Sequence, residues 1–165
     1  MSDRRDRIAA RLQERGAETL AIFTALEPGE WDSPVYPADD AGAPLWTARD
    51  MLCHFISAER SFLRLFEDVL AGGSGAPEDF DIDRFNRSQV AKMADIPIEE
   101  LLEQFAAIRG EVIAFVRALD EADLDREGRH PFFGIVSLEK ALKLIYRHNG
   151  LHERDMRRAL GEDAS

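Results

Sequence analysis

The sequence predicts an all-α protein, a four-helix bundle with long connections and a short accessory helix. Three observations indicate this fold. Apolar residues recur at the 3.6-residue spacing of amphipathic helices in four long stretches. Residues that favour helix starts precede three of these stretches. No segment alternates polar and apolar residues over the length of a strand. Four such helices bury their apolar faces best by packing on one another.

The first predicted helix runs from Asp3 to Leu26, with Ile8, Leu12 and Phe23 on its apolar face. Pro28 and Gly29 end it. The connection that follows, residues 27–46, contains four prolines and is longer than most connections in compact domains. Such a segment is either the wall of a pocket or a passive crossover, and the sequence alone favours neither.

The second helix starts at Thr47, which is placed as an N-cap with Asp50 in the manner of a capping box, and continues to Leu70. Residues 71–80, rich in glycine, predict a flexible break. Residues 81–93 then predict a short accessory helix.

Pro97 falls in the first turn of a third helix that continues to Leu119. An irregular segment, residues 120–136, precedes the fourth helix. Ser137 is the expected N-cap of this last helix, which extends to Leu160.

Length and charge narrow the possible roles of the chain. With 165 residues, we expect one domain spanning positions 1–165. The net charge of −11 repels a phosphate backbone, so we expect no nucleic-acid partner. No apolar run is long enough for a membrane span, and the N-terminus lacks the apolar core of a secretion signal. Cys53, the single cysteine, has no partner for an internal disulfide. We therefore expect a cytoplasmic protein with no membrane partner.

Two histidines in the fourth helix form the most informative pattern. His148 and His152 are four residues apart, so they lie on one face with Cβ atoms about 5–6 Å apart, and one metal ion can contact both rings. They interrupt an apolar stripe. Its members at helical intervals on either side are Ala141, Ile145, Met156 and Ala159. The pair therefore points into the protein, where unpartnered polar groups are costly.

A third histidine, His54, lies on the inward face of the second helix. Three protein ligands with a vacant fourth position are typical of catalytic metal sites. The alternative is that the histidines are structural and bond to backbone carbonyls or to acids such as Asp155. Spacing and expected burial leave both interpretations open.

Other polar residues near these positions have two interpretations each. Asp50 is either a carboxylate that orients the ring of His54 or a helix cap. Glu59 and Asp155 are candidate general bases, against the simpler interpretation of exposed charges on a solvated face. His130 precedes a proline, which favours a pocket or structural role over that of a fourth ligand. Cys53 is expected in the core.

Three segments of the chain resemble the DinB superfamily of metal-binding four-helix bundles. They are LWTARDMLCHFISAER, FDIDRFNRSQV and HPFFGIVSLEKALKLIYRHNGLHERDMRRAL. The resemblance covers nearly the whole chain. Its most specific parts are a helix start with a tryptophan and one histidine, here Trp46 and His54, and a closing helix with two further ligands at His148 and His152.

The resemblance implies an up-down-down-up bundle that frequently forms a homodimer. It implies that His54, His148 and His152 hold a divalent metal ion, often zinc or nickel. It also implies metal-activated chemistry on a small-molecule substrate, in some relatives with a low-molecular-weight thiol as cosubstrate.

These expectations define two hypotheses from different classes. The first is a metal-dependent enzyme, either a thiol S-transferase or a hydrolase, with His54, His148 and His152 as metal ligands. The second is a non-catalytic stress-related or interaction module, in which the bundle dimerises and the metal is structural or absent.

Overall fold

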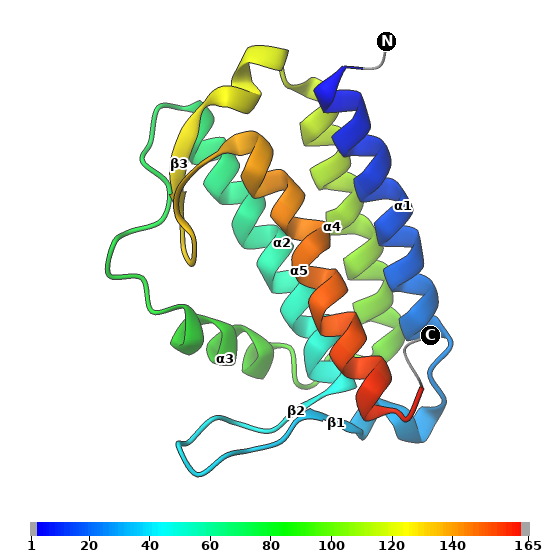
Figure 1. Ribbon diagram of the computed structural model, residues 1–165. Helices are drawn as coiled ribbons and strands as arrows, with labels where there is room; N and C mark the ends of the chain where they lie inside the picture. The colour runs from blue at the N-terminus through cyan, green and yellow to red at the C-terminus, as the bar shows by residue number, and fades with distance from the viewer. Residues whose placement is uncertain (1–2, 163–165) are drawn as a thin grey trace.

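The four-helix bundle is confirmed by the structure, a computed structural model that describes residues 3–162 (Figure 1). Four long helices run side by side, and a shorter one lies beside the lower part of α2 and crosswise to it (Figure 1). They are α1 (Arg4–Thr24), α2 (Ala48–Leu70), the short α3 (Ile82–Lys92), α4 (Ile98–Ala118) and α5 (Leu138–Ala159). None of the helices in this range is both long and apolar enough to cross a membrane.

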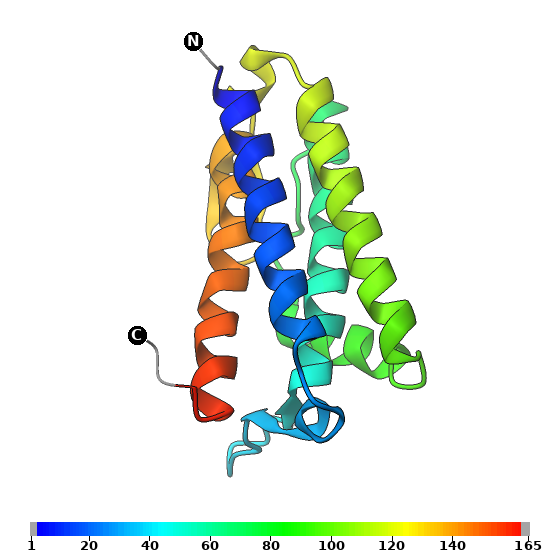
Figure 2. The same cartoon turned by 90° about the vertical axis from the view of Figure 1, so that its right-hand side faces the viewer.

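The long helices follow the up-down-down-up order, in which the first and last run one way and the two between them run the other way. The chain descends along α1, returns along α2, and ascends again along α4 before it descends along α5 (Figures 1 and 2). Helices α1 and α2 each pack against α4 and α5. Because α2 and α4 are parallel, the segment between them must pass back along the bundle, and this segment carries α3.

The predicted starts of α2 and α5 are confirmed by their caps. Thr47 accepts a hydrogen bond from the backbone N–H of Asp50, and the Asp50 carboxylate accepts one from the N–H of Thr47 at 2.9 Å. Ser137 Oγ accepts from the N–H of Lys140 at 3.2 Å. The first helix ends at Thr24, two residues before the predicted Leu26.

The connections contain short elements that periodicity did not predict. Each of the two long connections holds a 3₁₀ turn and a small antiparallel hairpin. In chain order these are η1 (Pro28–Asp32), β1 (Pro34–Tyr36), β2 (Trp46–Thr47), η2 (Glu121–Asp125), β3 (Glu127–His130) and β4 (Gly134–Ser137). Strands of two to four residues are too short to show an alternation, so backbone pairing alone defines them.

The glycine-rich segment 71–80, predicted as a flexible break, is tied to the second hairpin. The N–H of Ala76 donates to Arg129 O at 2.9 Å, and the N–H of Arg129 donates to Ser74 O at 2.8 Å. Gly75 lies between them with a φ of +86°, and a Cβ there would come within 2.6 Å of the Arg129 backbone nitrogen. The segment therefore follows β3 closely.

The apolar core is divided into two clusters along the bundle. One surrounds Leu12, Phe66 and Val112, and the other surrounds Phe23, Phe55 and Phe105. Polar residues occupy the level between them, one or two from each long helix. They are Thr19, Glu59, Arg109, Asn149 and Glu153, all buried.

Arg109 connects all four long helices within this polar layer. Its guanidinium donates to both carboxylate oxygens of Glu59 on α2, at 2.8 and 2.5 Å, and to Leu12 O on α1 at 2.9 Å. With its amide turned to satisfy both of its groups, Asn149 on α5 accepts from Arg109 Nη2 at 2.9 Å. The bidentate pairing and the added acceptors satisfy a buried charge that would otherwise be costly.

We predict that Glu59→Gln lowers the free energy of unfolding by about 3–5 kcal/mol, because it leaves the buried Arg109 without a countercharge. Urea denaturation measures the change. The control is Glu78→Gln, since Glu78 is 82% exposed in its ion pair with Arg129 and should change stability by about 0–1 kcal/mol. Equal effects of the two substitutions would contradict the structural role of the buried pair.

Candidate metal centre

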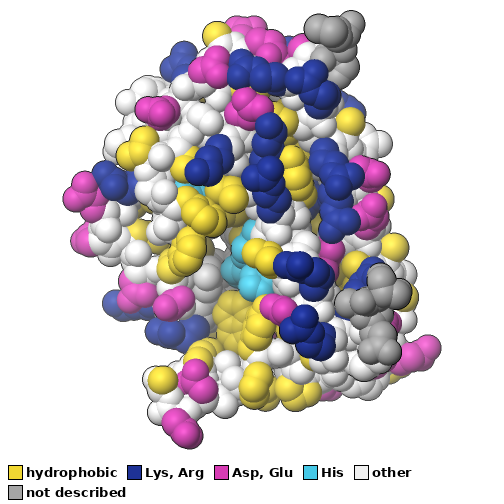
Figure 3. All heavy atoms as spheres, viewed as in Figure 1, with side chains coloured by type: hydrophobic (Ala, Val, Ile, Leu, Met, Phe, Trp, Pro, Cys, Tyr) yellow, Lys and Arg dark blue, Asp and Glu magenta, His cyan; other side chains and the backbone are white. Residues whose placement is uncertain are grey.

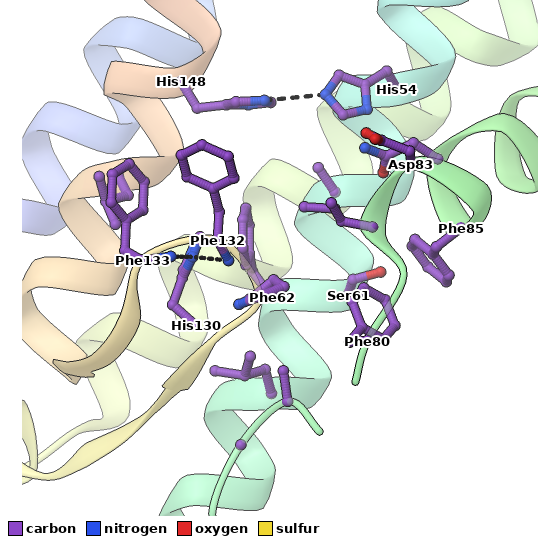
Figure 4. Close-up of a pocket in the computed structure, with 18 of the residues that line it drawn as sticks. His54, Ser61, Phe62, Phe80, Asp83, Phe85, His130, Phe132, Phe133 and His148 are labelled. Carbon is purple, nitrogen blue, oxygen red and sulfur yellow. Dashed lines mark hydrogen bonds between the residues drawn. The ribbon is translucent and has the colours of Figure 1, made fainter. Parts of the chain in front are cut away.

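Three histidine side chains from two helices meet at one point. His54 extends from α2, and His148 and His152 extend from successive turns of α5. The Nε2 atom of His148 lies 3.0 Å from Nε2 of His54 and 3.0 Å from Nε2 of His152. Figure 4 shows His54 and His148 pointing at one another. The residues predicted as metal ligands are thus brought together, although 94 residues separate the first two.

Burial keeps these three rings neutral. It lowers the pKa of His54 and of His148, and it lowers the pKa of His152 to about 4. The neighbouring His148 lowers the pKa of His54 and of His152 further. Neutral imidazoles are the form that binds metal. The sequence pattern predicted that these rings face the interior of the protein, and their burial confirms it.

Without a cation, the three ring nitrogens that face one another cannot all be paired in hydrogen bonds. Nε2 of His148 faces two nitrogens, yet it holds either one proton or one lone pair, so it forms one good hydrogen bond at most. The ligand atoms of the three rings all lie within 4.8 Å of one another. A divalent ion between them would accept all three lone pairs. The donor set and its geometry therefore fit a metal.

The far side of His152 has a partner of its own. Its Nδ1 lies 2.7 Å from the hydroxyl of Tyr36, and that hydroxyl donates to Asp155 Oδ2 at 2.5 Å. Burial and the Asp155 carboxylate raise the pKa of Tyr36, so the phenol keeps its proton. By contrast, Nδ1 of His54 and Nδ1 of His148 have no hydrogen-bond partner among the described residues.

The three-histidine cluster lies on the wall of a cavity with a volume of about 690 Å³. Figure 3 shows histidine side chains within a hollow bordered by hydrophobic ones. Helices α2, α3 and α5, the second hairpin and Trp46 all contribute to the wall. Its aromatic members are Trp46, Phe62, Phe80, Phe85, Phe132 and Phe133. The structure thus favours a pocket wall over a passive crossover for the end of the 27–46 connection.

His130 lines the same cavity but stays outside the three-histidine cluster. Its Nδ1 accepts from the backbone N–H groups of Phe132 at 3.1 Å and Phe133 at 3.2 Å, and its ring stacks on Phe62 with centroids 5.2 Å apart. Burial lowers its pKa to about 4. The imidazole therefore holds the turn that carries the two phenylalanines.

A comparison with known proteins agrees with this fold. The family model of the DinB superfamily matches residues 11–156. The chain belongs to the DinB superfamily. No curated protein sequence matches it significantly.

Several solved structures share this DinB bundle. YfiT from Bacillus subtilis, a probable metal-dependent hydrolase, is 22% identical with a TM-score of 0.73, over 98% of this chain and 90% of YfiT. The mycothiol-dependent maleylpyruvate isomerase is 10% identical with a TM-score of 0.75, over 94% of this chain and 63% of the isomerase. The colibactin self-resistance protein ClbS, solved with double-stranded DNA, is 10% identical with a TM-score of 0.73, over 94% of both chains. At these identities the likeness concerns the fold.

The other candidates from the sequence lie away from the cavity of the DinB bundle. Asp50 caps α2 through Thr47. Glu59, interpreted as an exposed charge, is instead 1% exposed, because it faces the interior of the bundle and Arg109 neutralises it there. Asp155 is half-buried and bonds to Tyr36.

Two further expectations concern α2 and α5. Cys53 is buried as expected, and burial raises its pKa to about 11. Ala159, placed on the apolar stripe of α5, is exposed, because it lies in the last turn beyond the core.

Sequence reasoning missed Tyr36, Asp83 and the phenylalanine pair of the β3–β4 turn. Tyr36 and Asp83 stand in segments with no pattern that points to a site. The adjacent Phe132 and Phe133, directly after His130 and a proline, offered a signal, since two large apolar residues in a loop call for an explanation.

We predict that the metal-free protein loses stability as the pH falls from 6.5 toward 4. An unfolded histidine has a pKa of about 6.5, whereas burial lowers the pKa of His54, His148 and His152 in the folded state. The unfolded chain then binds more protons in this window, and each such histidine removes about 1.4 kcal/mol per pH unit.

Urea midpoints of EDTA-treated protein between pH 7.5 and 5 measure this slope. Above pH 6.5 the contribution of these histidines to the free energy of unfolding should not change with pH. His152→Gln, with one buried imidazole fewer, should show a shallower slope. If stability falls no more steeply with pH in the wild type than in this variant, His152 does not have the lowered pKa that its burial implies.

Proposed function

We propose that this DinB protein is a divalent-metal-dependent enzyme that hydrolyses an apolar small molecule. One observation carries the proposal: three neutral imidazoles converge on the wall of a largely aromatic cavity. Three protein ligands leave a position for water or substrate. The similarity of YfiT, a probable metal-dependent hydrolase with the same fold, adds support.

The ligands of the ion would be Nε2 of His54, His148 and His152. A divalent ion supplies a Lewis acid, which acidifies water and polarises a carbonyl group. The protein supplies the surroundings. Phe62, Phe85 and the other aromatic side chains of the cavity bind the apolar part of the substrate and exclude bulk water.

A proton acceptor is also available in the cavity wall. Asp68 and Asp83 are its two carboxylates. Asp68 accepts the backbone N–H of Gly75 at 3.1 Å, whereas Asp83, on α3, makes no hydrogen bond or ion pair with the described residues. We assign to Asp83 the role of accepting a proton from the attacking water (Figure 4). The earlier candidates Asp50, Glu59 and Asp155 are already held by other groups.

A second candidate function is the transfer of an anionic low-molecular-weight thiol. It is favoured by two arginines, Arg64 and Arg147, which line the cavity and are exposed. Arg147 forms no ion pair within the described part of the chain. Guanidinium groups bind carboxylates well, and these two place positive charge at the cavity of a protein whose net charge is −11. Release of a thiol or consumption of one in the assay separates the two reactions.

The non-catalytic alternative predicts a metal site that is saturated or absent. Cobalt substitution tests it, because the visible spectrum of cobalt reports the coordination number. An open site should bind azide or another small anion with a spectral change. A four-ligand protein site with no such change would favour a structural metal.

Protein purified without a histidine tag is expected to contain about one divalent ion per chain, measured by elemental analysis. His148→Gln should reduce this content at least tenfold, because Nε2 of His148 is the centre of the cluster. His130→Gln is the matched control, since it changes another buried histidine of the same cavity, and it should retain the ion. A metal-free wild type that takes up no zinc, nickel or cobalt would overturn the proposal.

Phe132→Ala is expected to raise KM for an apolar substrate about fivefold without loss of metal. Its ring is 72% exposed in the free protein and projects from the β3–β4 turn into the wall of the cavity, so a ligand would cover it (Figure 4). A series of p-nitrophenyl esters provides the assay. Ile135→Ala is the control, because Ile135 is 55% exposed on the same hairpin but does not line the cavity. An equal effect of both changes would contradict this role.

A further inference from the structure

Tyr36 reaches the metal centre from a distant part of the chain. It ends strand β1, 116 positions before His152, and its hydroxyl lies 2.7 Å from the Nδ1 atom of that histidine. The same hydroxyl is 2.5 Å from Oδ2 of Asp155. The rings of Tyr36 and His152 meet edge to face, with centroids 5.7 Å apart.

The number of available protons fixes the direction of these hydrogen bonds. A carboxylate only accepts, so the single proton of the Tyr36 hydroxyl goes to Asp155. The hydroxyl oxygen can then only accept from His152, whose Nδ1 must carry the proton. The Nε2 atom of His152 is left with its lone pair, and this is the atom that faces His148.

We propose that Tyr36 and Asp155 are positioning residues that hold His152 in its metal-binding tautomer and orientation. This inference rests on the proposed metal centre. It assigns Asp155 a role through Tyr36, in place of the general base considered from the sequence. It also makes the connection between α1 and α2 part of the metal site.

The position of Tyr36 is itself fixed by the fold. Strand β1 pairs with β2, and the N–H of Ala48 donates to Ser33 O at 3.1 Å. Val35, the neighbour of Tyr36, is buried in the apolar cluster around Phe55. Strand β2 leads directly into α2, which carries His54. Strand β1 therefore links the start of α2 to the end of α5 at the level of the metal.

Only one of the three ligands is held in this way. The Nδ1 atoms of His54 and His148 have no hydrogen-bond partner in the described chain, so those rings are oriented by packing and by the contact between their Nε2 atoms. Metal-binding histidines usually donate their second nitrogen to an acceptor, and losing that acceptor costs about 10–100-fold in metal affinity. Removing the hydroxyl of Tyr36 leaves Nδ1 of His152 without its acceptor, and we therefore expect the metal affinity to fall.

The first experiment measures zinc affinity of Tyr36→Phe by competition with a chelating dye. The phenylalanine keeps the ring and removes only the hydroxyl. We expect the zinc Kd to rise about 10–100-fold. Tyr146→Phe, the same change at the other tyrosine of the chain, should leave it unchanged. Asp155→Asn, which retains an acceptor but loses the charge, should fall between wild type and Tyr36→Phe.

The second experiment observes the tautomer of His152 in the metal-free protein by ¹⁵N NMR at pH 7.5, with His152→Gln used to assign the signal. The wild type should show Nδ1–H, and Tyr36→Phe should show a mixture of tautomers. A Kd within twofold of wild type for Tyr36→Phe, or an Nε2–H tautomer in the wild type, would overturn the inference. If the wild type binds no zinc, the proposed function fails, while the tautomer measurement still decides the role of Tyr36.

Discussion

The buried ion pair between Glu59 and Arg109 belongs to a polar layer that sets the geometry of the three-histidine cluster. This layer includes Asn149 and Glu153, the residues that directly follow His148 and His152. Neighbours on a helix are turned by about 100°. When Asn149 and Glu153 face the polar layer, the two histidines must face α2 and the cavity. Asn149, which accepts from Arg109, and Glu153, which accepts from Arg15 and Thr19 on α1, therefore fix the rotation of α5 about its axis, and with it the direction of both imidazoles.

The same layer imposes a requirement on α1. Gly16 stands opposite Arg109, and a Cβ at this position would lie 2.8 Å from Nη1 and 2.9 Å from Cγ of that arginine. Glycine inside a helix costs about 0.5–1 kcal/mol relative to alanine. Here it allows α1 to approach until Leu12 O accepts from the guanidinium at 2.9 Å. A small local cost thus permits a buried contact between the backbone of α1 and Arg109 of α4.

The sequence predicted the parts of this protein that depend on local regularity. The bundle followed from helical spacing, the start of α2 from Thr47 and Asp50, and the histidine pair from its four-residue interval. Glu59 and Tyr36 were beyond its reach for a physical reason. Glu59 becomes buried only because Arg109, 50 residues later, neutralises it, and Tyr36 acquires a role only when β1 is placed against α5. Charge and polarity predict exposure until the partner is known.

The cavity and the three-histidine cluster are physically coupled in this bundle. Side chains of both α2 and α5 line the cavity, among them Phe62 and Leu144, so apolar packing between these two helices is incomplete there. The missing contacts would weaken the pairing of α2 with α5. His54 and His148, one on each helix, lie at the edge of the same space, where a shared ion would join the helices. Under the proposed function, a cavity of this size therefore makes the bundle more dependent on the ion, and closer packing of α2 against α5 would remove the cavity.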